Sequence, residues 1–262
     1  MLTLALDTAT RWGRFAVADE GLVRAYRPLN VAGSYADALL PAIGDTLADA
    51  GCSRDDLRAI AVTAGPGSFT GVRIGVATAK ALAWGLGVPL YPVSSLAAMA
   101  AALLAGHPEA ELAVPALDAR RGEVFAAVYR RDGDWVSVVA EPAAATPDAW
   151  WERVVAAVGD PEAPAYGGEG AALLLGQGET LRPELAARGT PVLRRWTSAH
   201  PATARDLALA VARGAVPAGD AFLLTPSYLR ASDAELNRHL DCTPSRPDAA
   251  PSGHWTRREP AP

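Results

Sequence analysis

Lysine is almost absent from this sequence of 262 residues, because Lys80 is the only one and the other cationic side chains are arginine. A Schiff-base mechanism or a lysine general base would therefore depend on Lys80 alone. Cysteine is scarce too, since Cys52 and Cys242 are the only two and they lie far apart in the sequence. This cysteine usage suits a reducing cytosol.

Histidine pairs with metal-binding spacing are missing. The four histidines lie more than four residues apart, at His107, His200, His239 and His254. No His-x-x-x-His or His-Glu-x-x-His motif can therefore hold zinc or iron from one helix. This argues against a metallopeptidase, and we expect no metal and no cofactor that belongs to this chain itself.

Long apolar runs are also missing, and the alanine-rich residues 96–105 are too few to span a membrane. The N-terminus has no basic region before its first apolar segment, so we expect no signal peptide, no membrane contact and a cytoplasmic protein. The net charge of -5 argues against nonspecific wrapping of nucleic acid. The pairs Arg130-Arg131 and Arg194-Arg195 could meet RNA phosphates, but solvated surface is the commoner role for scattered arginine pairs.

The apolar pattern predicts an α/β protein. Strands are expected over residues 2–7, 13–18, 22–27, 59–63, 88–93, 163–167 and 191–196, and helices over 34–50, 70–86, 147–158 and 202–213, with another after Ser94. Pro41 is expected to kink the first helix. Residues 243–262 are rich in proline, serine, alanine and arginine, and we expect a disordered tail from residue 231 onward.

The second half of the sequence repeats the first. Ala5-Leu6-Asp7, a polar turn and Gly13 are echoed by Ala116-Leu117-Asp118, a polar turn and Gly122. Such a duplication predicts two similar α/β domains, 1–108 and 109–230, that face one another across a cleft. The aspartates that end the first strand of each domain are expected near that cleft.

The stretch from Gly65 to Gly75 reads GPGSFTGVRIG and leads into a helix with few polar positions. A phosphate cradle is one interpretation, but the Walker and dinucleotide patterns both fail, so a tight turn with close helix packing is favoured. Because Gly71 and Gly75 lower helix propensity, we expect them to leave space for a second helix. A bulky residue at Gly75 would then separate two subunits and leave a folded monomer.

With this stretch the chain resembles the TsaB (YeaZ) family of bacterial tRNA threonylcarbamoyladenosine biosynthesis proteins. The other matching pieces are Leu6-Asp7-Thr8-Ala9-Thr10, Pro92-Val93-Ser94-Ser95-Leu96, Asp118-Ala119-Arg120-Arg121-Gly122-Glu123-Val124 and Tyr228-Leu229-Arg230. The resemblance covers residues 1 to about 230. Many relatives carry a histidine where this chain has Ser34-Tyr35, so a role for that histidine does not transfer.

The resemblance implies a duplicated actin-like ATPase (ribonuclease H-like) fold and a noncatalytic subunit. Members pair with the catalytic TsaD subunit, and a TsaE ATPase completes the complex, so that tRNA is met indirectly. Pairing would use the helices over residues 34–50 and 70–86, in a heterodimer or in a homodimer. The expected interface residues are Leu39, Leu40, Ile43, Leu47, Gly71, Val72, Gly75, Val76 and Ala79.

A nucleotide site is the alternative use of the expected cleft. Asp7, Thr8 and Thr10 resemble the first phosphate loop of actin-like ATPases, in which an aspartate holds metal-bound water and hydroxyls meet phosphate. Asp118, Arg120 and Arg121 could supply the facing loop. ADP or ATP could then bind at the cleft or at the junction with a partner. The competing function is an ATP-dependent small-molecule phosphotransferase with Asp7 and Asp118 at its centre.

Overall fold

The computed structural model describes residues 1–30, 35–160, 163–176, 196–197, 203–219, 224–227 and 229. Contacts group residues 1–230 into one compact unit. The tail expected from residue 231 onward lies outside the described residues. The same is true of most of the strand expected over 191–196, of the pair Arg194-Arg195, and of three of the four histidines.

The first half forms a five-stranded sheet with the order β3-β2-β1-β4-β5. Its elements are β1 (Thr3–Asp7), β2 (Trp12–Asp19), β3 (Leu22–Asn30), α1 (Tyr35–Asp49), a 3-10 turn (Arg54–Asp56), β4 (Ala59–Thr63), α2 (Phe69–Leu86), β5 (Leu90–Val93) and α3 (Ser95–Gly106). β1, β2 and β3 are antiparallel, whereas β4 and β5 run parallel to β1. The carboxyl ends of β1, β4 and β5 therefore meet at one edge of the sheet.

The second half repeats this arrangement, and its sheet has the order β10-β9-β6-β7-β8. Its elements are β6 (Leu112–Arg120), β7 (Glu123–Asp132), β8 (Trp135–Ala145), α4 (Pro147–Val158), β9 (Ala165–Gly167), α5 (Ala171–Leu175), β10 (Trp196–Thr197) and α7 (Thr203–Ala212). The register repeats as well, because Leu6 pairs with Phe15 on β2 and Leu117 pairs with Phe125 on β7. The duplication predicted from the sequence is confirmed.

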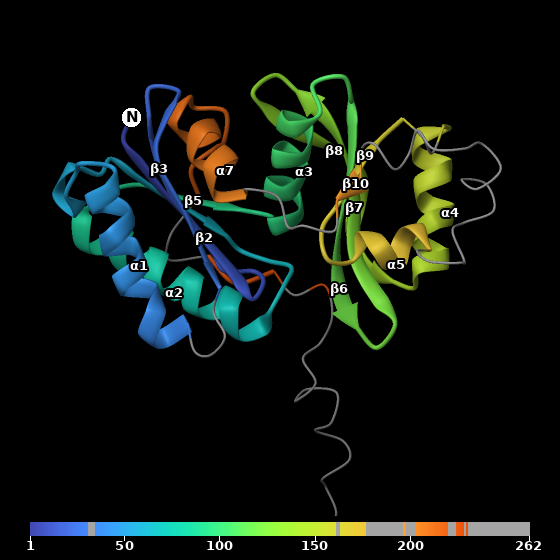
Figure 1. The fold of residues 1–262 in the computed structure, drawn as a ribbon, viewed down its shortest axis with the longest axis horizontal. Coiled ribbons are helices and arrows are strands. Elements are labelled where there is room, and N and C mark those ends of the chain that lie inside the picture. Colours follow the sequence, from blue (N-terminus) through green and yellow to red (C-terminus); the bar gives the residue numbers. More distant parts are fainter. Residues whose placement is uncertain are drawn as a thin grey trace, which may run out of the picture. The chain divides into compact units, whose positions relative to one another are not determined.

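Two helices lie between the sheets, and each belongs to one half of the sequence but packs on the sheet of the other (Figure 1). α3 follows the first sheet in the chain and contacts β6, β7, β8 and β9, whereas α7 follows the second sheet and contacts β1, β2, β3 and β4. α3 and α7 also contact each other. The chain therefore has the predicted duplicated actin-like fold, and the exchanged helices join its two halves.

The largest hydrophobic cluster fills the space around this middle layer. Leu96, Met99 and Leu103 of α3 are buried there with Leu207 and Val211 of α7. Separate clusters lie on the outer faces of the sheets, one beneath α1 and α2 and the other beneath α4 and α5. The predicted domain boundary near residue 108 stays a prediction.

α1 runs through Pro41 up to Asp49, as expected for the helix over residues 34–50, and the kink at Pro41 stays a prediction. The short helix α5 was not predicted. Within the described part of the chain, no helix has both the length and the apolar character that crossing a membrane would require.

Candidate functional site

The carboxyl ends of the strands in the first sheet gather polar side chains around Asp7. The Asp7 carboxylate is fully buried and accepts hydrogen bonds from the Thr63 hydroxyl at 2.8 Å and from the Ala9 amide at 3.1 Å. The hydroxyl of Thr203, the first residue of α7, donates to its other oxygen. Asp7 therefore ties β1 to β4 and to the helix contributed by the second half of the chain.

The two threonines after Asp7 also direct their hydroxyls inward. Thr8 is fully buried and donates to the carbonyl of Gly71 at 2.8 Å. The Thr10 hydroxyl bonds with the backbone of Trp12, and the Thr10 carbonyl accepts a bond from the hydroxyl of Tyr35 at 2.6 Å. Burial raises the pKa of the Tyr35 hydroxyl, so the phenol stays protonated and can donate this bond. The three residues of the expected phosphate loop thus form internal contacts, and their expected role in nucleotide binding stays a prediction.

The corresponding turn of the second half is exposed and strained. Arg120 and Arg121 have φ angles of 65° and 56°, in the left-handed region that is unfavourable for residues with a side chain. The Asp118 carboxylate accepts a bond from the Arg120 amide at 2.7 Å, so it serves this turn. Both arginine side chains are exposed, whereas Asp7 is fully buried, so the two loops that were expected to face one another lie in different environments.

The glycine turn packs against the loop that follows β1. Gly67 has a φ angle of 158°, and a Cβ atom on it would lie 2.8 Å from the Cβ atom of Ala9. The Ser68 amide donates to the Ala9 carbonyl at 2.6 Å, while the Ser68 hydroxyl accepts from the Gly71 amide and caps α2. The amides of Ser68 and Gly71 at this helix start are therefore used within the chain, in agreement with the favoured turn-and-packing interpretation.

The glycine side of α2 faces the chain itself, which corrects the expectation that it faces a second subunit. A Cβ atom on Gly75 would clash with the Thr8 hydroxyl and lie 3.1 Å from its Cβ atom, and one on Gly71 would clash with the Thr8 carbonyl. The glycines are required because the loop that follows β1 approaches α2 closely there. Of the expected interface residues, the structure buries Leu39, Ile43, Leu47, Gly71, Val72, Gly75, Val76 and Ala79 inside the monomer.

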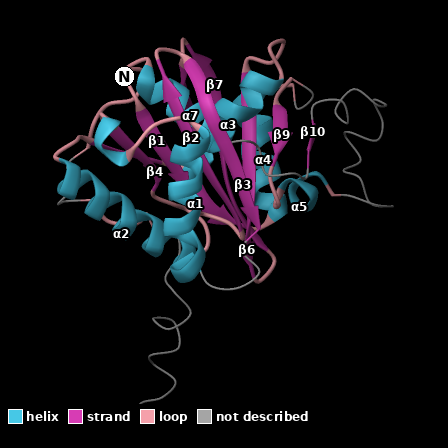
Figure 2. Ribbon diagram, turned by 60° about the vertical axis from the view of Figure 1, so that its left-hand side comes forward, coloured by secondary structure: helices cyan, strands magenta, loops and turns pink. Residues whose placement is uncertain are grey.

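Leu40 is the exception, because 61% of it is exposed on α1. α1 and α2 cover the same outer face of the first sheet (Figures 1 and 2). On α2, Trp84 is 75% exposed and Phe69 is 39% exposed, and the guanidinium of Arg73 lies 3.8 Å from the centre of the Phe69 ring. We call the exposed residues of these two helices the helix-pair face, and it comprises Asp37, Leu40, Pro41, Gly44, Asp45, Ala48, Asp49, Phe69, Thr70, Arg73, Ala77, Ala81, Trp84 and Gly85.

This face is a candidate docking surface because large apolar side chains are concentrated on it together with small residues. Exposed tryptophan, phenylalanine and leucine side chains are common anchors or apolar contacts at protein interfaces. Small residues at Gly44, Ala48, Ala77 and Ala81 allow another helix to approach closely. The sequence pattern selected mainly the buried sides of these two helices, and their role in pairing stays a prediction.

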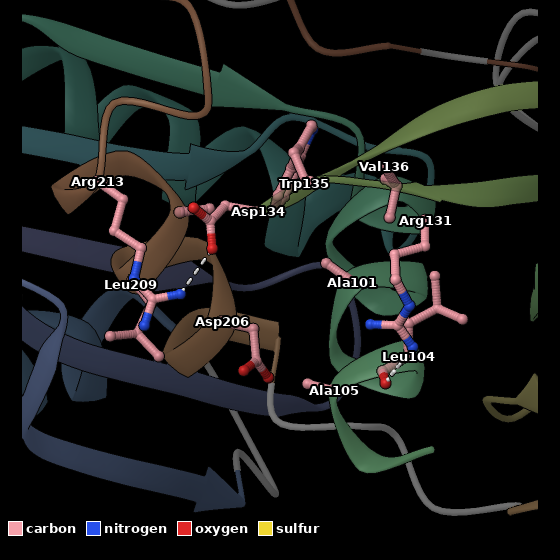
Figure 3. A pocket seen from close by; sticks show the side chains of 12 residues that line it. Ala101, Leu104, Ala105, Arg131, Asp134, Trp135, Val136, Asp206, Leu209 and Arg213 are labelled. Carbon is pink, nitrogen blue, oxygen red and sulfur yellow. Dashed lines mark hydrogen bonds and ion pairs between the residues drawn. The ribbon is translucent and has the colours of Figure 1, made fainter. Parts of the chain in front are cut away.

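A separate hollow of about 150 Å³ lies between α3, α7 and the turn that joins β7 to β8 (Figure 3). At its rim, Arg213 donates to Asp134 at 2.9 Å. Arg131 lies at the other side and donates to the carbonyls of Leu104, His107 and Ala110, which satisfies the end of α3. Arg131 therefore stabilises the C-terminal end of α3, which corrects its expected place on a solvated surface.

Asp206 projects toward the same hollow with a carboxyl that is only 10% exposed. Burial raises the pKa of this carboxyl, and the hydrogen bond from Arg205 offsets part of the rise. The pKa of Asp206 is therefore higher in the folded than in the unfolded protein. Protonated Asp206 stabilises the folded protein fully at pH values below the unfolded-state pKa, and this stabilisation is lost as the pH rises through the folded-state pKa.

Asp206→Asn is therefore expected to raise the free energy of unfolding at pH 7, because the amide is neutral like the protonated acid. The gain should shrink as the pH falls into the acidic range in which Asp206 itself takes up a proton. Urea unfolding of both proteins across this pH range measures the difference. A gain that is equal at every pH would contradict the burial effect.

Several residues of the site were missed by sequence reasoning. Thr63, at the end of β4, and Thr203, at the start of α7, both donate to Asp7, although they lie 56 and 196 residues from it in the chain. Their one sequence signal is a hydroxyl at the end of a strand or the start of a helix, which is too common to select them. Among the described residues, no group of three histidine, cysteine, aspartate or glutamate side chains could hold a metal ion.

Comparison with protein families gives one match that covers more than half of the chain. The family described as "TsaD: tRNA N6-adenosine threonylcarbamoyltransferase" matches residues 26–164. This region contains α1, the glycine turn, α2 and the first hairpin of the second half. The match therefore includes most of the residues on which the candidate site depends.

Curated relatives have names from the same process. The chain is 41% identical over 137 residues to "tRNA threonylcarbamoyladenosine biosynthesis protein TsaB" of Escherichia coli, covering 52% of this chain and 58% of that protein. It is 39% identical over 130 residues to the protein of the same name in Bacillus subtilis, covering 50% of this chain and 56% of the relative. The aligned part thus spans little more than half the length of these relatives.

A solved structure covers more of the chain. It is described as "Crystal structure of an uncharacterized protein with similarity to peptidase YEAZ from Pseudomonas aeruginosa" and superposes with a TM-score of 0.69 at 29% identity. The superposition covers 87% of this chain and 99% of the Pseudomonas chain. The likeness therefore extends through both halves of the duplicated fold.

Proposed function

Since this chain belongs to the TsaB (YeaZ) family, we propose that it takes part in tRNA threonylcarbamoyladenosine biosynthesis as a noncatalytic subunit. In this proposal it pairs with a catalytic TsaD subunit of the same fold and orders the active site of that partner. A TsaE ATPase joins the complex, and the tRNA is met through the partner. The complex is cytoplasmic.

The observation that carries the proposal is the helix-pair face. Leu40 on α1 and Trp84 on α2 are 61% and 75% exposed, although leucine and tryptophan usually lie mostly inside a protein. A partner helix that covers them would remove apolar surface from water, at roughly 25 cal/mol for each Å². The same face could also pair with a second copy of this chain, because a self-complementary patch forms a symmetric dimer.

The internal use of the strand-end residues supports the noncatalytic role. Asp7, Thr8 and Thr10 donate to or accept from groups of the chain itself, so a substrate would have to displace these buried hydrogen bonds. Displacing them is costly because each buried polar group left without a partner costs about 1–3 kcal/mol. A nucleotide that acts in this complex would therefore bind at the junction with the partner or on the partner itself.

Leu40→Glu tests the proposed pairing. The variant should fold normally because the side chain is 61% exposed, and it should bind TsaD at least tenfold more weakly because it buries a carboxylate in an apolar contact. Titration calorimetry with purified TsaD measures the affinity, and sedimentation measures any homodimer.

Leu173→Glu is the matched control, since Leu173 is a 46% exposed helical leucine in the second half of the chain. It should leave both kinds of pairing unchanged. If Leu40→Glu binds TsaD as tightly as the unmodified chain, the helix-pair face is not the docking surface.

A further inference from the structure

A short segment near the end of the described chain returns to the first half and lies against α2. We call residues 224–227 the strap. The Ser227 amide donates to the carbonyl of Ala64, at the end of β4, at 2.7 Å. Leu224 is half-buried and packs against the hydrophobic cluster beneath α1 and α2. The strap is therefore attached at both of its ends.

The glycine turn is built to accept the strap. A Cβ atom on Gly65 would lie 2.5 Å from the carbonyl oxygen of Ser227, and the φ angle of 103° also favours glycine there. The chain leading to the strap is held on the same side, because the Gly219 amide donates to the Leu90 carbonyl of β5 at 2.9 Å. Close backbone approach and paired hydrogen bonds indicate a specific contact.

Lys80 joins the strap to α2. Its ammonium group donates to the carbonyl of Leu224 at 3.2 Å, from a half-buried position. At about 100° per residue, Lys80 projects within about 40° of Arg73 and Trp84 on the helix. Lys80, the only lysine of the chain, thus lies at the edge of the exposed side of α2, between that side and the strap.

We propose that the strap holds α2 in the position that the partner recognises, and that Lys80 is the positioning residue that locks it. This inference rests on the proposed function, because it concerns regulation of the same helix-pair face. Partner docking and attachment of the strap are then coupled. In a chain whose strap is released, α2 is displaced and the partner binds less tightly. Lysine suits the role because its flexible stem packs along the helix while its ammonium reaches a backbone carbonyl.

Lys80→Met and Lys80→Arg test the lock in the full chain. Methionine keeps the apolar stem but cannot donate, so the Ser227 amide should exchange its hydrogen at least tenfold faster and TsaD should bind at least fivefold more weakly. Arginine keeps a cationic donor and should restore both quantities to within twofold of the unmodified chain. Exchange at Ser227 is followed by NMR, and affinity by titration calorimetry.

Arg54→Met is the matched control, because Arg54 is a cation with a 74% exposed side chain away from the strap. It should change neither quantity. Unchanged exchange at Ser227 in Lys80→Met would overturn the lock, and faster exchange with unchanged affinity would overturn the coupling. If the unmodified chain does not bind TsaD at all, the proposed function and the coupling both fail, while the exchange data still decide whether Lys80 locks the strap.

Discussion

Gly75→Ala is expected to lower the free energy of unfolding by about 2–3 kcal/mol, as overpacking of a tight contact does. The added methyl group would clash with the buried hydroxyl of Thr8, which is itself held by the carbonyl of Gly71. The sign of the effect is informative, because alanine in an open helix position is favoured over glycine by about 1 kcal/mol. Urea unfolding followed by circular dichroism measures the change.

Gly85→Ala is the matched control on the same helix, since a Cβ atom on Gly85 would meet nothing within 4 Å. That variant should gain up to about 1 kcal/mol. Adding Thr8→Ala to Gly75→Ala should recover part of the loss, because it removes the clashing hydroxyl. A stabilised Gly75→Ala protein would mean that this side of α2 is open, as the sequence alone suggested.

The same contact changes what a larger residue at Gly75 is expected to do. The sequence suggested that a bulky side chain would separate two subunits and leave a folded monomer. In the structure, Gly75 is buried against Thr8, so Gly75→Arg would disrupt the first half of the chain itself. Loss of partner binding in that variant would therefore say nothing about the docking surface, for which Leu40 is the better position.

Asp7→Ala is expected to cost about 3–5 kcal/mol, close to the loss when one partner of a buried charged network is removed. The substitution leaves the Thr63 hydroxyl, the Thr203 hydroxyl and the Ala9 amide without their acceptor. Because Thr203 starts α7, the contact between the first sheet and this exchanged helix should weaken as well. Urea unfolding without any nucleotide measures the loss, and hydrogen exchange of α7 amides locates it.

Asp118→Ala is the matched control, since Asp118 ends the equivalent stretch of the second half but is only half-buried in an exposed turn. It should cost about 1 kcal/mol or less. This pair also separates the proposed subunit from a phosphotransferase. If Asp7→Ala kept full stability and lost ATP turnover that the unmodified chain possessed, Asp7 would be a catalytic group and the noncatalytic proposal would be wrong.

Most of the fold could be predicted from the sequence because its signals are local or repeated. Strand periodicity found β1, β4 and β5, glycine and serine marked the start of α2, and the echo between Asp7 and Asp118 revealed the duplication. The exchange of α3 and α7 between the two sheets has no such signal. A helix that is apolar on most sides is compatible with several neighbours, and only the packing of both halves selects one.

The candidate site was harder to predict because exposure depends on distant parts of the chain. Apolar periodicity identifies the side of a helix that is buried, and it therefore selected Val72, Val76 and Ala79, which lie inside the monomer. Trp84 was overlooked as a candidate docking residue although it lies on the exposed side of the same helix. A large aromatic residue opposite an apolar stripe is the signal that could have found it.

The sequence by itself determined the class of the fold, its duplication, the family and the pair of helices on which the proposed function rests. The fold class and the duplication follow from spacing within a short stretch or from repetition of one, whereas the pair of helices is what the resemblance to the family implies. Only the tertiary structure decided what the glycine stretch from Gly65 to Gly75 is for, because its neighbours Thr8 and Ser227 are far away in the chain. Contacts between distant residues fix which side of a helix is buried, and thereby which side is left for a partner.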